Sequence, residues 1–137
     1  MNTAYETAMR VALDHAKLAS ASGDVPVGAV VLHKNEIIAA RHNEREVLSD
    51  PTAHAEVLAL RDAAAVLGTW HLDECTLVVT LEPCMMCAGA LINARIHTLV
   101  FAAIGISSSV LMFDIVNTLL YNIHWHPTAG PNSLQWV

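Results

Sequence analysis

Short runs rich in β-branched residues alternate along this chain with longer segments of helical periodicity. Strands are predicted over residues 25–33, 36–41, 75–81 and 97–103, with Lys34-Asn35 as the turn of a hairpin between the first two. Helices are predicted from Thr3 to a stop at Gly23 and over residues 50–67 and 84–94. Because strands that alternate with helices form a sheet covered on both faces, we predict an α/β fold.

The size and charge of the chain limit its class. Its 137 residues fit one domain, 1–137, and a balance of 54% hydrophobic to 15% charged residues excludes a disordered polar chain. A net charge of −6 and the lack of any basic run argue against a surface that binds phosphates throughout. Three cysteines do not make a secreted disulfide framework, and residues 1–20 carry charges in place of an apolar leader. We therefore expect a cytoplasmic protein.

The C-terminal segment, residues 102–137, is atypical because Asp114 is its only acidic residue and it has no lysine or arginine. A transmembrane span is one interpretation of its apolar runs, but Asp114, Asn117 and Asn122 interrupt them. We favour a helix or strand buried in the core or in a subunit contact, and we predict no membrane partner.

Two motifs carry the chemistry, Pro-Thr-Ala-His-Ala-Glu at residues 51–56 and Leu-Glu-Pro-Cys-Met-Met-Cys at residues 81–87. Cys84 and Cys87 lie three apart at the start of a predicted helix, so their sulfurs share one face and the helix N-terminus favours thiolates. His54 is expected in the first turn of the preceding helix. Since one imidazole and two thiolates suit Zn²⁺, we predict that His54, Cys84 and Cys87 hold a zinc ion.

Three protein ligands leave the fourth metal position open, which is the catalytic arrangement in which the pKa of a bound water falls to about 7. Glu56 is placed to pass protons to a ring nitrogen and then to a leaving amine. Cys75 begins the strand that leads to Cys84, about 30 Å away along an extended chain, so we interpret it as a core residue. A redox Cys-x-x-Cys pair is the alternative, but its combination with His-x-Glu is typical of zinc-dependent nucleobase deaminases.

Four features carry a family resemblance: Asp-Val-Pro-Val-Gly-Ala-Val at residues 24–30, Asn43, Asp-Pro-Thr-Ala-His-Ala-Glu at 50–56, and Thr-Leu-Glu-Pro-Cys-Met-Met-Cys-Ala-Gly-Ala at 80–90. Through them, residues 5–101 resemble the bacterial tRNA-specific adenosine deaminases. The run at 50–56 is more specific than the general zinc signature, because cytidine deaminases usually have a cysteine in place of His54.

The resemblance implies a cytidine-deaminase-like, three-layer α/β/α fold with a mixed central sheet, one zinc ion per subunit and a homodimer. It implies hydrolytic conversion of adenosine to inosine at the wobble position of tRNA, with the anticodon loop as partner. Asn43 would then hydrogen-bond the flipped base, Val25 would form a wall of the pocket, and the Ala55 backbone would hold the base or the attacking oxygen.

The resemblance ends after Phe101, and Gly105 stands where the family has an aspartate expected near the substrate ribose. The segment that follows is either a genuine divergence or a truncated or frame-shifted end. Two alternative functions follow: a deaminase of a free base, guanine or cytosine, and a non-catalytic partner subunit that keeps zinc for stability. Glu56 argues against the second alternative, because a structural zinc site has no use for that carboxylate.

Overall fold

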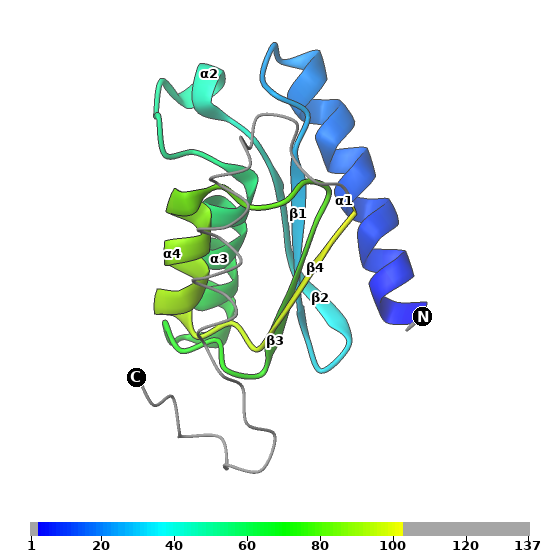
Figure 1. The fold of residues 1–137 in the computed structure, drawn as a ribbon, viewed down its shortest axis with the longest axis vertical. Coiled ribbons are helices and arrows are strands. Elements are labelled where there is room, and N and C mark those ends of the chain that lie inside the picture. The colour runs from blue at the N-terminus through cyan, green and yellow to red at the C-terminus, as the bar shows by residue number, and fades with distance from the viewer. Residues whose placement is uncertain (1–2, 103–137) are drawn as a thin grey trace. The chain divides into compact units, whose positions relative to one another are not determined.

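The computed structural model describes residues 3–102, in which strands and helices build one sheet and its two covering layers (Figure 1). In chain order the elements are α1 (Thr3–Ala21), β1 (Gly28–His33), β2 (Glu36–His42), α2 (Arg45–Leu48), α3 (Ala55–Leu67), β3 (Cys75–Val79), α4 (Met85–Ala94) and β4 (Thr98–Phe101).

The four strands form a mixed sheet in the order β2-β1-β3-β4. β1 is antiparallel to both β2 and β3, whereas β3 and β4 run parallel. The predicted hairpin between β1 and β2 is confirmed: Lys34 and Asn35 both have positive φ, 51° and 67°, as a two-residue turn of the primed type requires. The parallel pair needs a crossover, and α4 supplies it.

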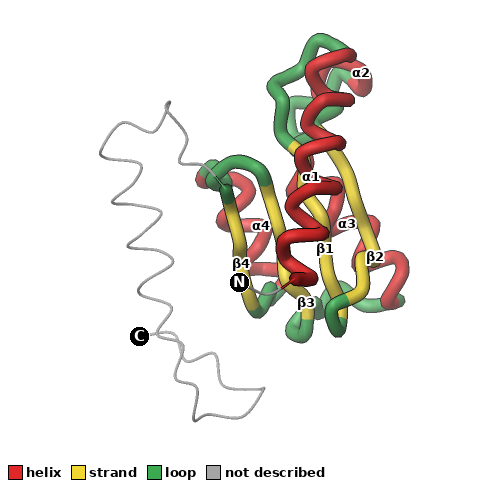
Figure 2. The backbone as a smooth tube through the Cα atoms, turned by 90° about the vertical axis from the view of Figure 1, so that its right-hand side faces the viewer, coloured by secondary structure: helices red, strands yellow, loops and turns green. Residues whose placement is uncertain are grey.

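Helices cover both faces of the sheet, so the predicted three-layer α/β/α architecture is confirmed. Figures 1 and 2 show α1 along one face and α3 with α4 along the other. The buried side chains of β1 alternate accordingly. Val30 packs in a cluster with Ala8 and Ala12 of α1, whereas Val31 packs in a second cluster with Ala59 of α3. The α3 and α4 layer is the one that positions the candidate site.

Gly28, the glycine of the Pro-Val-Gly-Ala run, allows α1 to lie directly against β1. A Cβ atom at this position would stand 1.8 Å from the main-chain oxygen of Ala12 and 2.8 Å from the nitrogen of Ala16. Both obstacles belong to the helix backbone, which cannot move aside as a side chain would. Only glycine therefore fits where the two elements cross.

The structure corrects several predicted boundaries. The first strand begins at Gly28 and not at residue 25, and the single turn α2 lies between the second predicted strand and the helix predicted from residue 50, where no element was predicted. The helix predicted from residue 50 begins at Ala55, so His54 caps it from outside the first turn. Asp50 instead closes a separate turn, accepting hydrogen bonds from the amide and the hydroxyl of Thr52 at 2.8 and 2.7 Å.

The atypical segment lies outside the described residues, except for Ala102, so the predictions made for it stay predictions. Within residues 3–102, no helix combines the length and apolar character needed to cross a bilayer.

Candidate metal and catalytic site

The two motifs meet at the N-termini of α3 and α4. His54 directly precedes α3, Cys84 directly precedes α4, and Cys87 lies in the first turn of α4. The Nδ1 atom of His54 is 3.5 Å from the sulfur of Cys87 and 3.7 Å from the sulfur of Cys84. The candidate ligand atoms of the three side chains all lie within 4.8 Å of one another. Two loops 30 residues apart in the chain thus bring the predicted ligands to one point.

These separations match what a tetrahedral zinc ion requires. Bonds of about 2.3 Å to sulfur and about 2.0 Å to nitrogen at tetrahedral angles put the nitrogen and a sulfur about 3.5 Å apart. The two nitrogen–sulfur distances, 3.5 and 3.7 Å, lie within about 0.2 Å of that value. A set of one imidazole and two sulfurs also favours zinc over the hard cations Mg²⁺ and Ca²⁺. The residues present therefore fit a zinc ion bound through Nδ1 of His54.

The two sulfurs differ in their affinity for a proton. A hydrogen bond from the Cys87 thiol lowers the pKa of Cys84 to about 5, with further help from the Cys87 and Met86 amides at the start of α4. The same hydrogen bond, burial and the neighbouring Glu56 carboxyl raise the pKa of Cys87. A dication bonded to both sulfurs would favour the thiolate form of each.

Glu56 is a buried carboxyl group beside these sulfurs. Its side chain projects from the first turn of α3, and the residue is 3% exposed. Its Oε2 atom has no hydrogen-bond partner among the described residues, and burial raises the pKa of the group above its ordinary value. A buried carboxyl that has one oxygen without a partner and is easily protonated is suited to exchanging protons with a bound reactant.

Asn43 is hydrogen-bonded to the other two residues that were predicted to contact substrate, Val25 and Ala55. It follows β2 and is 3% exposed. Its Oδ1 accepts a hydrogen bond from the Ala55 amide at 2.8 Å, and its Nδ2 donates to the Val25 carbonyl at 3.1 Å. One Nδ2 hydrogen and one Oδ1 lone pair remain for a ligand. The Ala55 amide is thus bonded to Asn43, and the predicted contact of the Ala55 backbone with the base or the attacking oxygen stays a prediction.

Asp24 was not singled out from the sequence, although it lies next to Val25. Its side chain is fully buried and accepts hydrogen bonds from Arg45 and from the amides of Val25 and Glu46. Burial alone would raise the pKa of Asp24, but these donors together hold it below its ordinary value. From the sequence alone, a single acidic residue in an apolar run is expected at the surface. Its burial could not be predicted because its partner, Arg45, lies 21 positions away in the chain.

Cys75 lies apart from the three ligands, at the beginning of β3, and is 1% exposed. Burial raises the pKa of its thiol. Among the described residues, the potential metal cluster is formed by His54, Cys84 and Cys87 without it. Its interpretation as a core residue agrees with this position.

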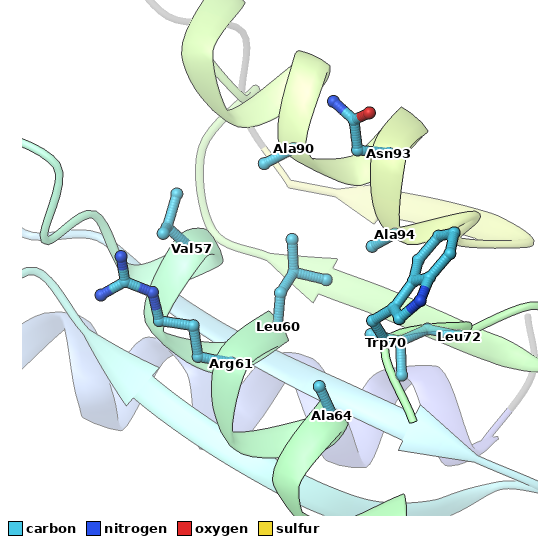
Figure 3. A pocket seen from close by; sticks show the side chains of 9 residues that line it. All are labelled: Val57, Leu60, Arg61, Ala64, Trp70, Leu72, Ala90, Asn93 and Ala94. Atoms are coloured by element: carbon cyan, nitrogen blue, oxygen red, sulfur yellow. The ribbon is translucent and has the colours of Figure 1, made fainter. Parts of the chain in front are cut away.

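An apolar groove of about 300 Å³ lies between α3 and α4, and the residues that line it do not include the three candidate ligands (Figure 3). Leu60 points between the two helices, while Arg61 and Trp70 lie at opposite ends of the view. The guanidinium of Arg95 stands 5.3 Å from the Trp70 ring. None of the residues that line the groove was predicted to be functional, because in the sequence each belongs to an ordinary helical pattern or loop.

Comparison with known proteins relates the chain to deaminases. The model of the MafB19-like deaminase family matches residues 3–123. The tRNA-specific adenosine deaminase of Aquifex aeolicus is 45% identical over 121 residues, which cover 85% of this chain and 80% of that protein. The chain spans less than two thirds of the length of several other curated relatives of that name.

Two solved structures share the fold. One, from work on A-to-I editing by tRNA:A34 deaminases at the wobble position of transfer RNA, superposes with a TM-score of 0.74 at 39% identity and covers 77% of each chain. The guanine deaminase of Bacillus subtilis superposes with a TM-score of 0.71 at 42% identity, covering 76% of this chain and 66% of that one.

Proposed function

The chain belongs to the MafB19-like deaminase family, and from this premise we propose that it is a zinc-dependent hydrolase that converts adenosine to inosine at the wobble position of tRNA. The observation that carries the proposal is the cluster of His54, Cys84 and Cys87 beside the buried carboxyl of Glu56, whose Oε2 atom has no partner among the described residues. A structural zinc site would be closed by four protein ligands and would leave such a carboxyl without a role.

The reaction replaces the amino group of adenine by the oxygen of water, so a C–O bond forms, the C–N bond breaks and ammonia leaves. A zinc ion held by His54, Cys84 and Cys87 would act as a Lewis acid that makes water a nucleophile at neutral pH. Glu56 takes one proton from the attacking water and delivers it to the ring nitrogen, and it then takes the second proton from the new hydroxyl group and passes it to the leaving amine. Burial raises its pKa, which makes the carboxylate a better acceptor of the proton that it must first take.

Asn43 holds the base through the donor and acceptor that its own hydrogen bonds leave free. Val25, with 48% of its surface exposed, forms a wall of the pocket, and the Ala55 amide keeps the Asn43 carboxamide in place. The base must leave its stack to enter such a buried site, which an unpaired anticodon loop allows at lower cost than a duplex.

The remaining features of the proposal extend beyond the site. The chain acts as one deaminase domain in the cytoplasm, with one zinc ion per subunit and as a homodimer. The apolar groove between α3 and α4, with the half-exposed Trp70 at its end, is a surface suited to the subunit contact.

A second function, deamination of free guanine, is favoured by the similarity to the guanine deaminase of Bacillus subtilis. Both reactions replace the exocyclic amine of a purine and would use the same metal and proton carrier. They differ in the base, adenine or guanine, and in whether that base is part of an RNA. Purified, zinc-analysed protein incubated with an anticodon stem-loop and, separately, with guanine distinguishes them. Inosine in the stem-loop, read by mass, supports the tRNA function. Ammonia and xanthine from guanine with an unchanged stem-loop would overturn it in favour of the free base.

A further inference from the structure

Asp24 is a buried charge that the proposed reaction does not use. It lies just beyond the end of α1, and its side chain has no solvent exposure, whereas that of its partner Arg45 is 33% exposed. Burying a carboxylate is costly unless hydrogen bonds replace its hydration. The donors around Asp24 supply this replacement, so the arrangement is specific and depends on the charged form.

The two carboxylate oxygens are used for different purposes. Oδ1 accepts from the Val25 amide at 2.7 Å and from the Nε and Nη2 atoms of Arg45 at 3.1 and 2.9 Å. Oδ2 accepts from the Glu46 amide at 3.1 Å. Every partner is a donor, so only an acceptor without hydrogens can satisfy them all. Asp24 thereby ties the Val25 turn to the single turn α2.

The connection continues from Val25 to the base-binding side chain. The Val25 carbonyl accepts from Nδ2 of Asn43 at 3.1 Å, and the same carbonyl accepts from the Val27 amide at 2.8 Å, which tightens the turn. Oδ1 of Asn43 then accepts from the Ala55 amide at 2.8 Å. A continuous path of hydrogen bonds runs from Arg45 through Asp24 and Val25 to Asn43, and it ends on the α3 N-terminus.

We propose that Asp24 is a positioning residue that fixes the Val25 wall and the Asn43 carboxamide for the base, with Arg45 holding it in place. The proposal rests on the substrate role given to Asn43 under the proposed function. Asp24 does not touch the base or the metal ligands. Because the side chains that the path orders, Val25 and Asn43, are those that hold the base, its loss weakens substrate binding more than it slows the chemical step.

The test compares Asp24→Asn with Asp62→Asn in the zinc-loaded protein. The carboxamide introduced by Asp24→Asn would keep one acceptor but turn an NH₂ group toward the Glu46 amide, donor against donor. Asp62 of α3 accepts from Arg41 at 2.9 Å, so its variant also breaks a carboxylate–arginine pair but leaves the pocket wall alone. Steady-state kinetics on an anticodon stem-loop, zinc content and the NMR signals of the Asn43 side-chain amide are measured for both.

For Asp24→Asn we expect a KM raised by about tenfold or more, kcat within about threefold and unchanged zinc, as for loss of a charge-assisted hydrogen bond that orders the pocket. The Asn43 amide signals shift and exchange with solvent faster. For Asp62→Asn we expect neither change. If Asp24→Asn leaves KM and the Asn43 signals as in the wild type, or if Asp62→Asn alters them equally, the positioning role is wrong.

Failure of the proposed function is seen separately, as a wild-type protein that does not deaminate the stem-loop. In that case the Asn43 signals of the two variants still decide whether Asp24 positions the carboxamide. If Asp24→Asn does not fold, Arg45→Gln disrupts the same ion pair by changing the partially exposed arginine in place of the buried carboxylate. It is expected to raise KM in the same direction and to move the same amide signals, and no movement overturns the proposal.

Discussion

Replacing Glu56 by glutamine separates catalysis from stability at one position. The substitution keeps the shape of the side chain and removes its ability to carry protons. Loss of a general acid–base group lowers turnover by about 10² to 10⁴-fold. Zinc binding is retained, because none of the three proposed ligands changes. Inosine formation in an anticodon stem-loop and the zinc content of the same samples are the two assays.

The same substitution is predicted to stabilise the metal-free protein at neutral pH. Glu56 is 3% exposed and its Oε2 has no partner among the described residues, so its charged form is poorly solvated. An unsatisfied buried polar group costs about 1–3 kcal/mol, and more when charged, so a gain of about 1 kcal/mol in the free energy of unfolding is expected. The glutamine amide, which is neutral but also polar, recovers only part of the cost.

The gain depends on pH with a definite sign. Burial raises the pKa of Glu56 above its ordinary value of 4.5, so the folded protein holds this proton more tightly than the unfolded chain. Below pH 4.5 the carboxyl group is protonated in both states and costs the wild type no free energy of unfolding relative to the variant. The wild type loses stability as the pH rises through the folded-state pKa of Glu56. Denaturant unfolding of both metal-free proteins at about pH 4 and about pH 8 measures this difference. A variant that turns over normally, or one that is less stable than the wild type at the higher pH, would refute the reasoning.

Three further predictions follow from other parts of the structure. Cys84→Ser removes one of two sulfurs and is expected to lose stoichiometric zinc, measured by atomic absorption; a zinc content equal to the wild type would contradict the ligand assignment. Gly28→Ala places a methyl group against the α1 backbone and should lower the free energy of unfolding by about 1–3 kcal/mol, so an unchanged melting temperature would contradict the close approach. His15, whose ring lies 5.7 Å from that of His42, has a pKa held below 6.5 by burial and by the charges of His42 and Arg41. The contribution of neutral His15 to the free energy of unfolding is therefore complete above pH 6.5 and is lost as the pH falls through its lower pKa in the folded protein. His15→Gln should accordingly flatten the acid dependence of the melting temperature.

The order of strands and helices and the metal cluster were accessible from the sequence because both depend on local patterns. Alternating apolar residues define the strands, and the spacing of Cys84 and Cys87 places both sulfurs at one helix end. The convergence of His54 with them follows from the motif combination.

The boundary errors lie where polar contacts between distant segments override local signals. Asp50-Pro51 is a good helix start, but α3 begins at Ala55. The Ala55 amide donates a hydrogen bond to the side chain of Asn43, which lies 12 residues earlier in the chain. Valine at position 25 favours a strand, but its amide and carbonyl bond Asp24 and Asn43 instead of a neighbouring strand. The single turn α2 was missed for the same reason, since the buried Asp24 carboxylate holds it. Departures from local rules at a functional site are the expected pattern.

X-ray absorption at the zinc edge of the purified protein tests the central claim most directly, because it counts the ligand atoms of the ion. The account predicts one zinc ion with two sulfur neighbours at about 2.3 Å and two nitrogen or oxygen neighbours at about 2.0 Å. One of these is the His54 nitrogen, and the other is an exchangeable oxygen. A site of four protein ligands, a spectrum with three or four sulfurs, or a protein that retains no zinc would contradict it.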